Sequence, residues 1–277
     1  MTIKQIISVI LFIILISACN KQPKGRMVDL GGYKLHIYDI GNGNLTIILE
    51  SGLGDGLKSL NIIQKGIAGF TRVISYDRAG IGKSDISPLP CTYENMVKQL
   101  KLMLTAEQIP PPYILVGISM GGNIIRLFTN TYPEDVVGLV LVDASHEDFL
   151  DKIKENRTEE ELYKIDSIVN NLFSQESEII KDEWEAYKKG RELMKNVEIP
   201  TDIPIRVITS AKYEGNFKEF IPEEKVIWLD LHSEWVLNNP HAKHIVTDKS
   251  GHAIYREEPQ LVISSIKEII DEIKTIK

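Results

Sequence analysis

The stretch LVGISMGGNIIRLF, residues 115–128, places one serine between glycines where an apolar run gives way to an amphipathic pattern. Gly117 to Gly121 form a G-x-S-x-G pattern, with a buried strand expected before it and a helix after it. Such a tight turn presents the hydroxyl of Ser119 beyond the end of the strand, and the flanking glycines remove Cβ atoms that would clash with backbone. We therefore predict that Ser119 is a nucleophile.

A serine hydroxyl is a poor nucleophile at neutral pH, so it needs a base within hydrogen-bonding distance and a group that orients that base. The sequence has six histidines. Of these, only His252 lies in a tight turn, KSGHAIY, between a late apolar strand and the final helix. That position places it at the same sheet edge as Ser119, and we predict that His252 is the base.

Three carboxylates follow late apolar segments and compete for the orienting role. Asp143 ends the segment GLVLVDAS, Glu214 follows IPIRVITSA, and Asp248 precedes the histidine turn. Each also has a simpler interpretation: Asp143 as a turn cap, Glu214 as a solvated loop residue, and Asp248 as a charge before the turn. We favour Asp143 as the catalytic acid and retain Glu214 as the alternative.

The composition limits the classes of function. The chain has 277 residues, of which 43% are hydrophobic and 26% charged, which is typical of a globular domain large enough for one sizeable core. The formal net charge of −7 gives no electrostatic reason to expect a nucleic-acid partner. No H-E-x-x-H pattern occurs, and His241 and His244 in PHAKH are more typical of a surface segment, so we expect neither metal nor cofactor.

The N-terminus has the pattern of an export signal. A lone Lys4 precedes an apolar segment, residues 6–16, which is shorter than the ~20 residues that span a bilayer comfortably. The following ISAC resembles a bacterial lipobox, so we expect a lipoprotein signal peptide over residues 1–18 and lipidation of Cys19. Residues 19–26 would then be a polar tether, and the mature protein would be extracytoplasmic and anchored to the bacterial cell membrane. A plain secretory signal and an uncleaved anchor are the alternatives.

From Met27 onward, apolar β-rich runs alternate with helical patterns, which predicts an α/β fold with a mostly parallel sheet. Helical faces are expected in the segment 92–104, with Val97, Leu100 and Leu104, and in the last segment, with Val262, Ile266, Ile269, Ile273 and Ile276. The candidate strands span residues 34–41, 45–52, 72–80, 113–119, 136–145, 203–211 and 242–250.

Residues 146–197 interrupt this alternation. The region is highly charged and has helical spacing of apolar residues, including Leu162 and Leu172. Thr158, with Glu161 three residues later, predicts a capping box at a helix start. We expect a helical insertion between two strands, either a lid over a site or a surface decoration. The SHED segment, residues 145–148, would line the base of the lid or cap its first helix, and we favour the cap.

Four motifs in order, ESGLGDG, YDRAGIGKSD, GISMGG and SGHAIYREEPQLV, resemble those of the α/β-hydrolase fold superfamily, and the resemblance covers residues 27–277. It implies a central, mostly parallel sheet flanked by helices, and the chain order nucleophile, acid, histidine. It also implies an oxyanion hole formed by the backbone amides of Leu53 and Met120. Ser51 stands where many relatives have the histidine of a His-Gly pair, and Asp77 is expected to stabilise its own turn.

These predictions describe a serine hydrolase that cleaves a carboxylic ester or a related acyl bond of a small molecule through an acyl-enzyme. The serine argues against the dehalogenase and epoxide-hydrolase relatives, which carry an aspartate at this position. Two alternatives remain: a C–C hydrolase or haloperoxidase-like enzyme with the same triad, and a catalytically silent binding lipoprotein with the same fold.

Overall fold

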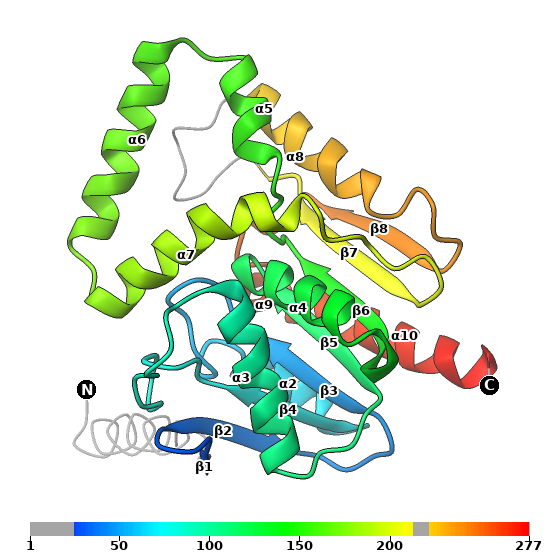
Figure 1. The fold of residues 1–277 in the computed structure, drawn as a ribbon. Coiled ribbons are helices and arrows are strands. Elements are labelled where there is room, and N and C mark those ends of the chain that lie inside the picture. Colours follow the sequence, from blue (N-terminus) through cyan, green and yellow to red (C-terminus); the bar gives the residue numbers. More distant parts are fainter. Residues whose placement is uncertain (1–24, 213–221, 277) are drawn as a thin grey trace, which may run out of the picture.

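Eight strands form one sheet within residues 25–212 and 222–276, the part of the chain that the computed structural model describes (Figure 1). The strand order is β1-β2-β4-β3-β5-β6-β7-β8. β2 pairs antiparallel with β1 and β4, and all other pairs are parallel, as predicted for a mostly parallel sheet. The strands are β1 Arg26–Asp29, β2 Lys34–Ile40, β3 Thr46–Glu50, β4 Arg72–Tyr76, β5 Tyr113–Ile118, β6 Val136–Val142, β7 Ile205–Ser210 and β8 Ala242–Thr247.

Helices cover both faces of this sheet. α3 and α4 lie on one face, whereas α2, α9 and α10 cover the other. The helices are α2 Asn61–Ile67, α3 Tyr93–Ala106, α4 Met120–Thr131, α5 Phe149–Glu155, α6 Glu159–Ser174, α7 Glu178–Met194, α8 Pro222–Glu234, α9 Ile254–Glu257 and α10 Pro259–Ile276. Among the described residues, no helix combines the length and apolar character that crossing a membrane requires.

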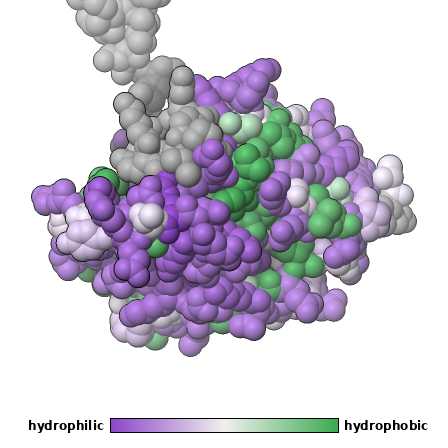
Figure 2. All heavy atoms as spheres, turned by 90° about the horizontal axis from the view of Figure 1, so that it is seen from above, coloured by the Kyte–Doolittle hydropathy of each residue, from purple (hydrophilic) through white to green (hydrophobic). Residues whose placement is uncertain are grey.

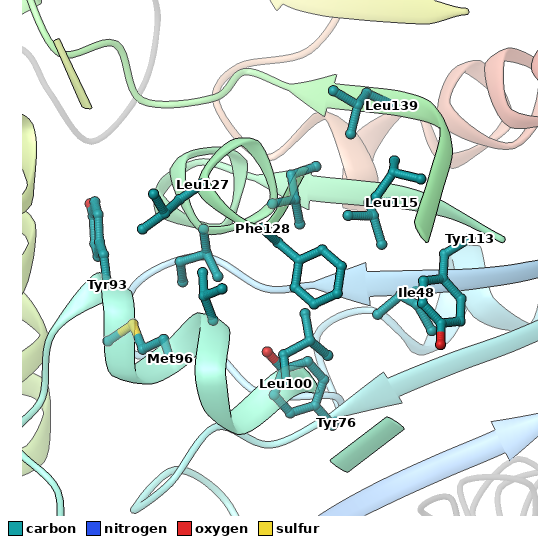
Figure 3. Packing of buried hydrophobic residues seen from close by; sticks show 14 of the residues in the cluster. Ile48, Tyr76, Tyr93, Met96, Leu100, Tyr113, Leu115, Leu127, Phe128 and Leu139 are labelled. Atoms are coloured by element: carbon teal, nitrogen blue, oxygen red, sulfur yellow. The ribbon is translucent and has the colours of Figure 1, made fainter. Parts of the chain in front are cut away.

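The central strands are mostly apolar because each of their faces is covered. β3 and β5 are buried at every position. Successive residues point to opposite faces, so Ile48 and Leu115 enter the core under α3 and α4, while Ile47 and Ile114 enter the core under α10. Figure 3 shows the first of these cores.

The predicted helical faces are confirmed. In α3, Val97, Leu100 and Leu104 are all buried, and Thr92 caps the helix by accepting a hydrogen bond from the amide of Asn95. Four of the five apolar residues predicted for the last segment are buried in α10: Val262, Ile266, Ile269 and Ile273. The side chain of the fifth, Ile276, lies outside the described part of the structure.

The insertion between β6 and β7 consists of α5, α6 and α7, as expected for residues 146–197. The capping box of Thr158 and Glu161 at the start of α6 is present. The apolar face of α6 is only partly covered, because Leu162 is half-buried whereas Leu172 is 57% exposed. Figure 2 shows the molecule from this side, with a band of hydrophobic side chains across a mostly hydrophilic surface.

Both ends of the insertion meet at Arg126, a buried residue of α4. The guanidinium donates to both carboxylate oxygens of Glu147, at 2.7 and 2.8 Å, and to the carbonyl oxygen of Val197, at 3.4 Å. The SHED segment supplies only part of the expected cap, because Nδ1 of His146 accepts a hydrogen bond from the amide of Asp148 at 3.1 Å. Asp148 makes no side-chain cap bond, while Glu147 pairs with Arg126 and the ring of His146 stacks on Trp235.

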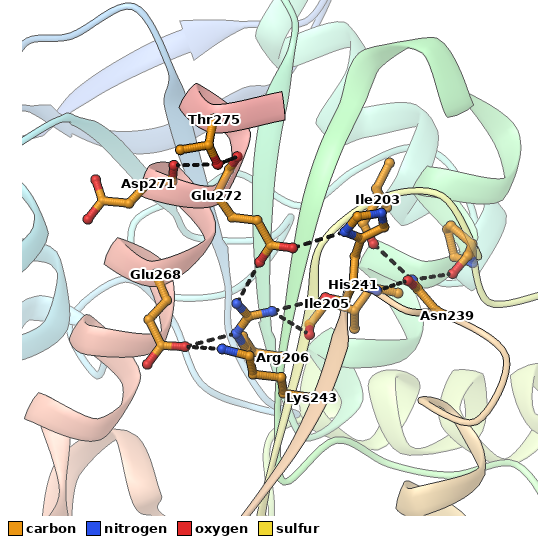
Figure 4. Close-up of polar contacts among 11 residues, drawn as sticks. Ile203, Ile205, Arg206, Asn239, His241, Lys243, Glu268, Asp271, Glu272 and Thr275 are labelled. Carbon is orange, nitrogen blue, oxygen red and sulfur yellow. Dashed lines mark hydrogen bonds and ion pairs between the residues drawn. The ribbon is translucent and has the colours of Figure 1, made fainter. Parts of the chain in front are cut away.

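A second buried guanidinium joins the sheet to the last helix. Arg206 of β7 binds the carboxylates of Glu268 and Glu272 in α10, at 3.2 and 2.7 Å (Figure 4). It also donates to the carbonyl oxygen of His241. These acceptors compensate the buried charge and hold α10 against the edge of the sheet.

Five described elements were not predicted. These are the strand β1, the helices α2, α8 and α9, and the short 3-10 helix Pro133–Asp135. β1 begins at Arg26, so the last residue of the predicted tether already belongs to the sheet. Residues 1–24, which contain the predicted signal peptide and Cys19, lie outside the described residues.

Two buried histidines lie near the carboxyl end of β6. His232 of α8 contacts the hydroxyl of Thr209 and the carbonyl oxygen of Ala144, each at 2.7 Å, and burial lowers its pKa to about 3. Burial likewise lowers the pKa of His146 to about 4. Both rings are therefore neutral in the folded protein at mildly acidic pH.

This burial predicts a loss of stability on mild acidification. An unfolded histidine binds a proton below about pH 6.5, whereas these folded rings do not, so the free energy of unfolding should fall as the pH drops from about 6.5 to 5. The slope is at most about 1.4 kcal/mol per pH unit for each histidine. Urea unfolding at pH 7, 6 and 5 checks this, and His146→Gln should make the slope shallower. A free energy of unfolding that stays constant over this range would contradict the burial of neutral rings.

Candidate active site

Ser119 lies between β5 and α4 with φ 53° and ψ −124°. Residues other than glycine rarely adopt this conformation, which costs about 1–3 kcal/mol and has to be offset by its surroundings. The chain at the end of β6 holds Ser119 through two backbone hydrogen bonds. The Ser119 amide donates to the carbonyl of Val142 at 3.2 Å, and its carbonyl accepts from the amide of Ser145 at 3.0 Å.

The glycines around Ser119 are needed for close backbone packing. A Cβ on Gly121 would lie 2.6 Å from the carbonyl oxygens of Glu50 and Ser51. A Cβ on Gly122 would lie 2.3 Å from the Cβ of Ala144. The first turn of α4 can therefore approach the ends of β3 and β6 only without side chains at these two positions, and this approach fixes where Ser119 lies.

Asp143 lies beside Ser119 at the same edge of the sheet. In the parallel register of β5 and β6, Ile118 pairs with Val142, so Ser119 and Asp143 are the next residues of the two chains. Asp143 also has a positive φ of 42°, which turns the chain out of the strand. The parallel pairing of two neighbouring strands thus brings the predicted nucleophile and the favoured acid together.

The carboxylate of Asp143 is buried and its two oxygens have different partners. Oδ1 accepts hydrogen bonds from the amide of Ser210, at 3.0 Å, and from Nε1 of Trp228, at 2.9 Å. Oδ2 lies 2.7 Å from Nδ1 of His252. Burial disfavours the charged form, but the hydrogen bond and charge of His252 outweigh it and hold the pKa of Asp143 below its usual value.

His252 lies between β8 and α9, and its side chain is 44% exposed. An ionised carboxylate can only accept hydrogen bonds, so the contact with Asp143 places the proton on Nδ1. The lone pair of the neutral ring is then on Nε2, the atom that a general base uses. This orientation is the one that a serine nucleophile requires.

The structure distinguishes the candidate acids by position. Asp143 contacts the imidazole, whereas Asp248 follows β8 in the turn that leads to His252. Glu214, the retained alternative, lies outside the described residues. The geometry favours Asp143, and its catalytic role remains a prediction.

The segment after β3 borders Ser119. A Cβ on Gly52 would lie 3.4 Å from the Cβ of Ser119 and 4.0 Å from its Oγ, so this backbone passes directly against the predicted nucleophile. Leu53 follows Gly52, and Met120 is the first residue of α4, where the helix dipole favours negative charge. Leu53 thus follows a residue that borders Ser119, and Met120 follows Ser119 itself. The oxyanion role of their amides stays a prediction.

Ser51 and Asp77 stabilise the surrounding loops. The hydroxyl of Ser51 donates to the carbonyl of Asp55 at 2.7 Å, which closes the loop from within. Asp77 accepts from the amides of Leu57 and Lys83, at 2.9 and 3.1 Å, as expected for a residue that stabilises its turn.

The histidines of the PHAKH segment have protein partners. His241 contacts Glu272, and His244 contacts the hydroxyl of Thr209. Within residues 25–212 and 222–276, no group of three or more histidine, cysteine, aspartate or glutamate side chains is arranged to hold a metal ion.

Four residues around the site were not assigned a role from the sequence. Trp228 and the amide of Ser210 hold Asp143, and neither belongs to a motif. Arg78 lies in the YDRAGIGKSD motif and contacts Glu183 of α7. The YDRAGIGKSD motif could have indicated a role for Arg78. In contrast, nothing in the sequence around Glu183 indicated a contact with the loop beside Ser119.

Comparisons with known proteins agree with this architecture. Residues 46–167 match the family described as alpha/beta hydrolase fold. A Bacillus subtilis relative, "Uncharacterized protein YqjL", is 28% identical over 83% of this chain and 85% of its own length.

Two solved structures are similar over most of the chain. A candidate lipase, lip1 of Acinetobacter baumannii AYE, has a TM-score of 0.65 at 16% identity, covering 92% of this chain and 93% of its own. The meta-cleavage product hydrolase CumD of Pseudomonas fluorescens IP01 has a TM-score of 0.61 at 16% identity, covering 90% and 98%. With its sheet order, its turn at Ser119 and these similarities, the protein has the fold of the α/β-hydrolase superfamily.

Proposed function

We propose that the protein is a serine hydrolase that cleaves a carboxylic ester or related acyl bond of a small molecule. The observation that carries this proposal is the contact of His252 Nδ1 with the buried carboxylate of Asp143, beside the strained turn at Ser119. This arrangement supplies a nucleophile, a base and an orienting acid from three neighbouring chain segments.

The proposed reaction proceeds through an acyl-enzyme. Nε2 of His252 takes the hydroxyl proton as Oγ of Ser119 attacks the substrate carbonyl carbon, and the carbonyl electrons move to its oxygen. The amides of Leu53 and Met120 stabilise this oxyanion. Its collapse expels the alcohol, which takes the proton from His252. Water then attacks the acyl-enzyme by the same steps, releasing the acid and restoring the serine.

The aromatic residues of the insertion do not by themselves define an acyl pocket. Trp184 stacks on Phe173 and on Tyr187, with ring centroids 4.5 and 5.2 Å apart. These rings therefore use much of their surface on one another.

A C–C hydrolase with the same triad is the second candidate. It is favoured by the similarity of the fold to CumD, a meta-cleavage product hydrolase. The haloperoxidase-like alternative has no comparable support. The silent-binder alternative depended on an incomplete triad, and the Asp143–His252 contact argues against that.

Ester hydrolysis by four matched proteins tests the main proposal. We expect the chain from Asn20 to Lys277 to hydrolyse a short-chain p-nitrophenyl ester, and Ser119→Ala to lower kcat by about 10⁴-fold or more. Asp143→Asn should lower it by about 10³- to 10⁴-fold, because the imidazole loses its orienting carboxylate. Glu214→Gln serves as the control and should stay within about twofold of the wild type.

Other results would change the assignment. A strong loss in Glu214→Gln with little loss in Asp143→Asn would transfer the acid role to Glu214. If the folded wild type cleaves no ester but an organophosphonate still labels Ser119, the C–C hydrolase becomes the better candidate.

We further propose that the mature chain is a lipoprotein, lipidated at Cys19 and held outside the cytoplasmic membrane. The support is the ISAC sequence after the short apolar segment, residues 6–16. Lipid attachment would keep the catalytic domain near the membrane through the segment that precedes β1.

Expression of the full chain in a bacterium with radiolabelled palmitate tests this anchor. The wild type should carry label and sediment with membranes, whereas Cys19→Ala should lose the label and leave the membrane fraction if export and cleavage continue at another site. Cys91→Ala is the matched control and should behave like the wild type. A Cys19→Ala chain that keeps the label would contradict the proposed anchor.

A further inference from the structure

Arg78 is buried against the loop that borders Ser119. Its Nη2 donates to the carbonyl oxygen of Gly52 at 2.7 Å, and its Nη1 donates to the carbonyl oxygen of Ser51 at 2.8 Å. The side chain is only 3% exposed. One rigid guanidinium therefore holds two consecutive carbonyl groups of this loop, residues 51–55, which we call the oxyanion loop.

This contact controls the direction of the next amide. The peptide between Gly52 and Leu53 is trans and planar, so its C=O and N–H point in opposite directions. Arg78 and the amide of Asp55 both bind the Gly52 oxygen, which turns the Leu53 N–H away from the guanidinium. The orientation of the predicted oxyanion donor therefore depends on the position of Arg78.

The insertion holds the same loop from its other side. Glu183 of α7 accepts from the amide of Gly54 at 2.6 Å and binds Arg78 through Nε and Nη2, at 2.7 and 2.9 Å. Ile180, one turn earlier in α7, packs on Gly54, where a Cβ would lie 3.5 Å from its side chain. A single carboxylate thus connects α7 both to the loop and to the residue that orients it.

The charges in this cluster make the arrangement interdependent. Arg78 also binds Glu50 at 2.7 Å, and Tyr76 donates its hydroxyl to the same carboxylate. Burial raises the pKa of Glu50, although Arg78 favours its charged form. One cation therefore lies between two buried carboxylates, and removing it would leave both uncompensated.

We propose that Arg78 and Glu183 are positioning residues that hold the oxyanion loop from α7, so that the Leu53 amide is aimed at the developing oxyanion. This inference rests on the proposed function, because an oxyanion exists only if the protein performs acyl transfer. It also implies a regulatory link. The position of α7 determines how the Leu53 amide is oriented, independently of the contact between Asp143 and His252.

The test uses variants of Glu183, because Arg78 substitutions risk unfolding. Glu183→Met keeps a similar volume but removes both acceptors, and Glu183→Gln keeps one. Each is assayed on a p-nitrophenyl ester and on its thionoester, whose sulfur accepts hydrogen bonds only weakly. Arg206→Lys is the control, since it alters another buried guanidinium, whose partly exposed partners Glu268 and Glu272 belong to α10 instead of the loop.

We expect kcat/KM on the ester to fall about tenfold in Glu183→Met and less in Glu183→Gln, with the change mainly in kcat. The thionoester rate should change less than twofold, so the ester-to-thionoester ratio falls. Arg206→Lys should lower stability without altering this ratio. A ratio that stays at the wild-type value in Glu183→Met, with ester turnover intact, would overturn the inference.

Amide hydrogen exchange separates this inference from the proposed function. In Glu183→Met, exchange in residues 51–55 should become faster, because Gly54 loses its acceptor. Unchanged exchange would overturn the positioning role. If the wild type itself cleaves no ester, the proposed function fails and the catalytic part of the inference fails with it, while the exchange rates still decide whether α7 holds the loop.

Discussion

The backbone of Ser119 has a conformation that an isolated loop would abandon, and three strands of the sheet prevent it from relaxing. Val142 of β6 and Ser145 just beyond that strand bind its amide and carbonyl, the end of β3 packs against Gly121, and β5 leads directly into Ser119. The carboxyl ends of β3, β5 and β6 meet at one edge because these strands are parallel neighbours. The exposed hydroxyl, the adjacent amides and the nearby carboxylate all follow from that alignment.

Buried guanidinium groups connect elements that are distant in the sequence. Arg78 joins the oxyanion loop to α7, Arg126 joins α4 to the insertion, and Arg206 joins β7 to α10. Taking such charges out of water costs several kcal/mol, which the Coulomb attraction repays only when hydrogen-bond geometry is good. We therefore infer that these clusters fix the relative positions of the elements they join more than they add to the free energy of unfolding.

The parts of the fold that could be predicted from sequence are those with a local pattern. The buried strands and the amphipathic α3 and α10 have such a pattern, but β1 is four residues long with one buried position, and α2 lacks a side-chain cap. In α8, apolar and charged residues are mixed, so no single face indicates a helix. The same limit applied to the site. Ser119 and His252 lie in motifs, whereas the contacts of Trp228 and Glu183 depend on how distant elements pack.

Both ends of the insertion bind the guanidinium of Arg126. The residues between them therefore leave the sheet and return to it at the same place. Glu147 and the carbonyl of Val197 are held together at Arg126, so entry and exit stay adjacent whatever lies between them. The number and length of the intervening helices can therefore change without displacing β6 or β7. In engineering terms, the insertion has two fixed attachment points, and a replacement would also have to supply the contact that Glu183 makes with the oxyanion loop. Grafting at Glu147 and Val197 would vary the cover of the site while the strand that carries Asp143 stays in place.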